Sequence, residues 1–88
     1  MAWFVKHETF TAETADLALA QRRPYLEAHR AWVEQEAKAG RRIRSGFLVD
    51  AQRRPGGGGL LIFEAASFTE ALEWVQQDPM IQAGLVSW

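Results

Sequence analysis

The sequence has no cysteine among its 88 residues. Disulfide bonds, thiolate metal sites and cysteine nucleophiles are therefore excluded. It also has no apolar run near the roughly 20 residues that a membrane-spanning helix needs. The N-terminus, MAWFVKHETF, lacks the basic segment and long apolar stretch of a signal peptide. We therefore expect a cytoplasmic protein that does not bind a membrane.

An excess of positive charge is also missing, since ten lysines and arginines face eleven aspartates and glutamates, for a formal net charge of −1. Phosphate backbones are held mainly by excess lysine and arginine, so we expect no nucleic-acid partner. The two histidines do not follow a metal-ligand spacing such as H-E-x-x-H. The glycine-rich segment RRPGGGG at 53–59 lacks the G-K-[ST] ending of a phosphate-binding loop. We predict neither a metal nor a cofactor.

The length and the balance of 48% hydrophobic and 24% charged residues are typical of one globular domain, here residues 1–88. Alternating and β-branched segments predict strands, and apolar positions at helical spacing predict helices. In chain order we expect a strand at 2–8, a main helix from Pro24 to 39, strands at 42–49 and 60–65, a helix at 67–76, a short helical turn opened by Asp78 and Pro79, and a short fourth strand at 85–88. The segment 53–59 is predicted to be a hairpin tip, because consecutive glycines hold regular structure poorly.

This order, β-α-β-β-α-β, predicts a ferredoxin-like α+β fold. Within it, the strand LLIF at 60–63 is apolar on both faces, whereas an antiparallel strand with one wet face should alternate. Two helices can cover only one face of the sheet. We therefore predict a homodimer in which the uncovered faces of two sheets pack together.

Three segments of the sequence, H-R-A-W-V-E-Q-E-A-K-A-G at 29–40, S-G-F-L at 45–48 and D-P-M-I-Q-A-G-L at 78–85, resemble the YCII-related, or YciI-like, domain family. The resemblance covers nearly the whole chain. It implies a dimeric α+β barrel built from two ferredoxin-like units. It also implies a His–Asp pair in a cleft, for which His29 and Asp78 occupy the matching positions. One type of member is linked to dehydrochlorination of a chlorinated hydroxyhydroquinone.

Each residue of this pair also has a structural interpretation. His29 falls on the apolar stripe of its helix, where a histidine is often part of the core or of an interface. Asp78 before Pro79 is typical of a helix N-cap. Together they predict an imidazole that acts as a general acid or base and whose tautomer is fixed by the carboxylate. We expect one carboxylate oxygen to cap the helix and the other to orient His29.

The predicted fold and the His–Asp pair are compatible with two functions. The first is a cofactor-independent small-molecule enzyme with lyase, isomerase or dehydrochlorinase-like chemistry that uses His29 and Asp78. The second is a non-catalytic dimer that binds a small ligand or has a regulatory role, because a fold does not decide a function.

Overall fold

The computed structural model describes all of residues 1–88. Its centre is an antiparallel four-stranded sheet with the strand order β2-β3-β1-β4. The strands are β1 (Ala2–Phe10), β2 (Ile43–Val49), β3 (Pro55–Ala65) and β4 (Val86–Ser87). The strand order and the succession of elements confirm the predicted ferredoxin-like α+β fold, including its short fourth strand.

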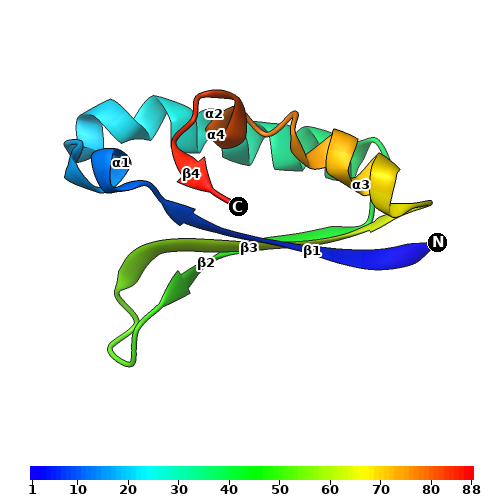
Figure 1. Ribbon diagram of the computed structural model, residues 1–88, viewed down its shortest axis with the longest axis horizontal. Helices are drawn as coiled ribbons and strands as arrows, with labels where there is room; N and C mark the ends of the chain where they lie inside the picture. The colour runs from blue at the N-terminus through cyan, green and yellow to red at the C-terminus, as the bar shows by residue number, and fades with distance from the viewer.

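All the helices lie on one face of the sheet, and the opposite face carries none (Figure 1). They are α1 (Ala12–Asp16), α2 (Leu19–Lys38), α3 (Phe68–Val75) and α4 (Pro79–Gln82). None of them combines the length and the apolar character that a bilayer-spanning helix needs. Lys6 of β1 and His29 of α2 both contact Asp78 between this helical layer and the sheet.

Strand β1 alternates as its sequence predicts. Phe4, Lys6 and Glu8 point toward the helices and are buried or half-buried, whereas Val5 and His7 lie exposed on the other face. This alternation places a lysine and a glutamate beneath the helices. Such groups are costly to bury unless they are paired.

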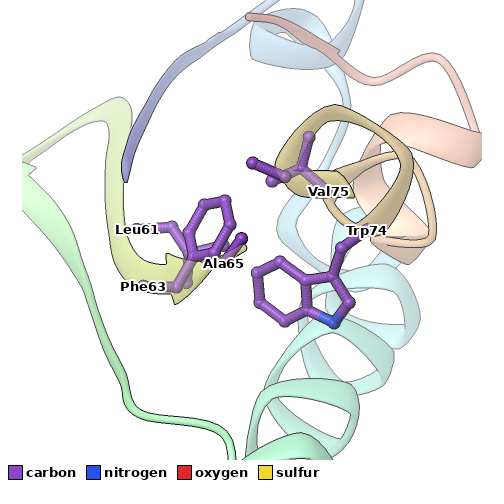
Figure 2. Packing of buried hydrophobic residues seen from close by; sticks show 6 residues of the cluster. Leu61, Phe63, Ala65, Trp74 and Val75 are labelled. Atoms are coloured by element: carbon purple, nitrogen blue, oxygen red, sulfur yellow. The ribbon is translucent and has the colours of Figure 1, made fainter. Parts of the chain in front are cut away.

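The hydrophobic core joins β3 to α3 (Figure 2). Leu61 and Phe63 point from the sheet toward Trp74 and Val75 of α3. The Trp74 ring lies 4.5 Å from the Phe63 ring and 4.7 Å from the Trp32 ring of α2, measured between centroids. These contacts fix both long helices over the sheet, because aromatic pairs in this range add to the burial of apolar area.

The start of the main helix differs from the prediction. Helix α2 begins at Leu19, and Pro24 lies inside it. The Gln21 side chain accepts a hydrogen bond from the Ala18 backbone N–H at 3.2 Å, which holds the first turn in place. Proline removes one backbone hydrogen bond, and near the N-terminal end of a 20-residue helix the remaining turns and the packing outweigh that loss.

The prediction for the glycine-rich segment is wrong. The tip of the β2–β3 hairpin lies at 50–54, where the Asp50 carboxylate accepts hydrogen bonds from the backbone N–H groups of Gln52 and Arg54. Strand β3 begins at Pro55 and includes all four glycines at 56–59. Gly59 pairs with both β1 and β2, and Gly58 pairs with β1, so the strand continues through this segment. Gly57 and Gly59 leave room for side chains of β1.

Candidate functional site

Asp78 lies in the turn between α3 and α4 and is completely buried. Its Oδ1 accepts a hydrogen bond from the backbone N–H of Met80 at 2.9 Å, and Pro79 follows as the first residue of α4. This confirms the N-cap that the Asp-Pro pair predicts, because proline suits the first helical position and aspartate satisfies a free N–H. The short helix α4 therefore holds the carboxylate rigidly.

His29 reaches this carboxylate from α2. Its Nδ1 lies 2.8 Å from Asp78 Oδ1, so the predicted contact between the two residues is present. One detail differs from the expectation: the same oxygen serves both His29 and the helix cap. Because a carboxylate oxygen accepts, Nδ1 carries the hydrogen and Nε2 of a neutral ring is the basic nitrogen. No group of the chain hydrogen-bonds Nε2, and the His29 side chain is 19% exposed.

The other carboxylate oxygen is occupied by a residue that the sequence reasoning missed. Lys6 Nζ lies 2.7 Å from Asp78 Oδ2, and the lysine side chain is 3% exposed. The same Nζ lies 3.1 Å from Glu8 Oε2. A signal was available in the alternation of β1, which predicts Lys6 on the face of Phe4. A lysine on a face covered by helices needs a buried anion.

These contacts determine the charge of Asp78. Burial raises the pKa of this carboxyl, but the hydrogen bonds from His29 and Lys6 and the positive charge of Lys6 outweigh burial, so the pKa lies below the ordinary value of 3.8. Asp78 is therefore ionised at neutral pH. An ionised partner on Nδ1 keeps the ring orientation fixed and stabilises a positive charge on the imidazole.

Glu8 owes its position to a glycine of the neighbouring strand. Glu8 pairs with Gly59 in the β1–β3 ladder, and a Cβ atom at residue 59 would lie 2.9 Å from Glu8 Oε1 and 3.3 Å from its Cγ. Gly57 likewise makes room for the ring of Phe10, at 3.0 Å. Gly59 therefore leaves the space that Glu8 occupies in the charged cluster of Lys6, Glu8, His29 and Asp78.

One atom each of Glu8, His29 and Asp78 lie within 4.8 Å of one another, which is the smallest set that could hold a metal ion. The ammonium group of Lys6 contacts both carboxylates of this set. Because it already neutralises part of their charge, the site attracts a second cation weakly. The expectation of a metal-free and cofactor-free protein stays a prediction.

A largely apolar cavity of about 220 Å³ lies between β1, α3 and the last residue of the chain. Lys6 lines it, together with His7 and the apolar residues Phe4, Val5, Phe63, Phe68, Ala71, Leu72, Val75 and Trp88. His29 does not line this cavity. His7, on the outer face of the sheet, does not join the cluster around Asp78.

The sheet order, the helices on one face and the His–Asp contact define a ferredoxin-like α+β protein with a polar cluster between helices and sheet. Residues 4–87 match the YCII-related domain, and the chain belongs to this family. It is also similar to the solved structure of 5-chloro-2-hydroxyhydroquinone dehydrochlorinase (TftG) from Burkholderia phenoliruptrix AC1100 in complex with 2,5-dihydroxybenzoquinone. The two are 26% identical with a TM-score of 0.72, and the match covers 99% of this chain and 87% of the other. No curated protein matches the chain.

Proposed function

We propose that this protein is a small-molecule enzyme in which His29, oriented by Asp78, exchanges a proton with its substrate through Nε2. The observation that carries the proposal is the 2.8 Å contact between His29 Nδ1 and a fully buried carboxylate, which leaves Nε2 without a partner in the chain. A histidine fixed in this way has the tautomer and the orientation of a general base.

The chemistry we propose is elimination or isomerisation on a small hydroxylated ring. The TftG likeness supports this class, since that protein is named for the loss of HCl from a chlorinated hydroxyhydroquinone. Such a loss is redox-neutral overall, because two hydroxyl groups of the ring become the two carbonyl groups of a quinone, one of their protons moves to the ring carbon that carried chlorine, and the other leaves together with the chloride ion. A base that removes a hydroxyl proton supplies what the step needs, without an oxidant or a reductant.

The test combines a binding probe with a turnover assay. Titration with 2,5-dihydroxybenzoquinone measures binding, and chloride release from 5-chloro-2-hydroxyhydroquinone measures turnover. We expect His29→Ala to retain binding and to lower turnover at least about 100-fold, the usual contribution of a general base. Glu27→Ala is the control, because Glu27 is exposed on the same helix, two residues before His29.

Turnover that is unchanged in His29→Ala would remove this residue from the mechanism. A second function, a non-catalytic module for a small apolar ligand, is favoured by one observation: His29 does not line the apolar cavity at β1 and α3. Probe binding that Phe68→Ala weakens, without turnover by the wild-type protein, would support that function and contradict the enzyme.

We also propose that two chains associate through the sheet faces that carry no helices. Trp3 is 51% and Val5 63% exposed on this face, next to Ile62 and Leu60 of β3. An exposed apolar sheet face of this kind is typical of an interface. We expect sedimentation velocity to give a dimer for the wild-type chain and a monomer for Val5→Glu, with Leu19→Glu on α2 as the control. A monomeric wild-type protein at about 100 μM would contradict the dimer, because obligate interfaces are complete well below that concentration.

A further inference from the structure

The charges around His29 do not balance. From β1 the ring faces Lys6 and Glu8, and from the turn before α4 it faces Asp78. On α2 itself, Tyr25 lies one turn before His29 and Arg22 two turns before it, and the Arg22 guanidinium lies over the Phe10 ring of β1 at 5.4 Å, outside the cluster. Helix α4 and strand β4 bring no charged side chain to the site. One positive and two negative charges leave the cluster with an excess negative charge while His29 is neutral.

Glu8 is the source of this excess. Lys6 and Asp78 alone, joined at 2.7 Å, would form a balanced pair beside the ring. Glu8, 3.1 Å from the same ammonium group, takes up part of the charge of Lys6 and leaves part of the charge of Asp78 uncompensated. Its side chain is 13% exposed, so solvent screens this effect only in part. A proton on His29 makes the four-residue cluster neutral.

We propose that Glu8 is a positioning residue for His29. Glu8 acts through Lys6 to supply negative charge to the cluster, and this charge stabilises the imidazolium that forms when His29 takes a proton from its substrate. The role rests on the proposed function of His29 as a base. It assigns to a residue on β1 a task that the His–Asp pair does not complete by itself, since Lys6 without Glu8 would offset the charge of Asp78.

Gly59 contributes to the position of the Glu8 carboxylate. A Cβ atom at this position would come within 2.9 Å of Glu8 Oε1, so a larger residue would push the carboxylate away from Lys6. The glycine therefore holds Glu8 in reach of the ammonium group, and Gly59→Ala offers a way to move the charge without removing it.

The test follows the proton on His29 by NMR, through the titration of its ring Hε1 signal. We expect Glu8→Gln, which keeps the shape and removes the charge, to lower the pH midpoint of His29 by about 1 unit, and Lys6→Met to raise it. His7, the second histidine, is exposed on the other face of β1 and serves as the reference in the same spectra. We expect its midpoint to move far less, because the strand separates its ring from Lys6 and Glu8, which lie on the opposite face.

Gly59→Ala should lower the His29 midpoint in the same direction as Glu8→Gln, while Gly46→Ala, where a Cβ atom meets nothing within 4 Å, should leave it in place. A His29 midpoint that stays within about 0.3 units in folded Glu8→Gln would overturn the proposal, since close charges shift a titration by more than this. The titration needs no substrate. A missing shift therefore overturns the role of Glu8 alone, whereas unchanged turnover in His29→Ala overturns the enzyme.

Discussion

Replacing Lys6 with methionine removes the only positive charge next to Asp78 Oδ2. In the wild-type protein this oxygen lies 2.7 Å from the ammonium group, while Oδ1 keeps its bonds to His29 and to the Met80 backbone. Methionine fills the space of the lysine stem but donates no hydrogen bond. Asp78 is completely buried, so water does not replace the lost partner.

The loss of stability follows from this geometry. Breaking a buried ion pair by removing one partner costs about 3–5 kcal/mol, because the other charge stays buried without compensation. Glu8 is partly exposed and turns to solvent, so it adds little to the cost. The methionine side chain is more apolar than lysine, and its burial recovers about 1 kcal/mol. We expect a net loss of about 3 kcal/mol in the free energy of unfolding at pH 7, a large share of the 5–15 kcal/mol typical of a native protein.

Urea denaturation followed by tryptophan fluorescence measures this loss. The matched control is Lys38→Met, because Lys38 is the second lysine of the chain and is exposed at the end of α2. We expect the control to change stability by less than about 0.5 kcal/mol. Adding Asp78→Asn to Lys6→Met should restore part of the loss, since no buried charge remains. A loss below about 1 kcal/mol in the single variant would refute the reasoning, because it would mean that Asp78 does not need Lys6.

Three further predictions concern other parts of the molecule. The pKa of Asp78 is lowered in the folded state, so the contribution of Asp78 to stability is complete above the ordinary pKa of 3.8 and is lost as the pH falls through the lower folded pKa. We expect urea denaturation midpoints to drop below about pH 4, and to drop less steeply in Asp78→Asn. Trp74→Ala should cost about 3–5 kcal/mol in urea denaturation, because the ring is in contact with Phe63 and Trp32 in the core, and a loss under 1 kcal/mol would contradict that packing. Arg53 has a φ of 63° in the hairpin tip, a strained backbone conformation for a residue with a side chain. Arg53→Gly should therefore raise the free energy of unfolding by up to about 1 kcal/mol and increase the melting temperature. A lower melting temperature would contradict this strain.

Local chemistry made much of the fold predictable. Alternation in β1 divides its side chains between the two faces of the sheet as the structure has them, and Asp78 with Pro79 predicted the start of α4. The two failures have physical causes. Pro24 favours a helix start by its own geometry, but the hydrogen bond that the Gln21 side chain accepts from the Ala18 backbone N–H, together with packing along α2, places the start earlier. The glycines at 56–59 favour a turn by themselves, but the pairing of Gly58 with β1 and of Gly59 with both β1 and β2 continues the strand through this segment.

The sequence alone determined the order of the elements, the cap at Asp78 and the pair formed by His29 and Asp78, because each depends on neighbouring residues or on a family pattern. Only the tertiary structure brought Lys6 and Glu8 to that pair, since 72 residues separate Lys6 from Asp78 and no local pattern links them. It also decided that one oxygen of Asp78 serves both the cap and His29, which leaves the other for the lysine. The charge that His29 experiences depends on these distances between β1, α2 and the turn before α4, and distances across a fold are not encoded in any one segment of the chain.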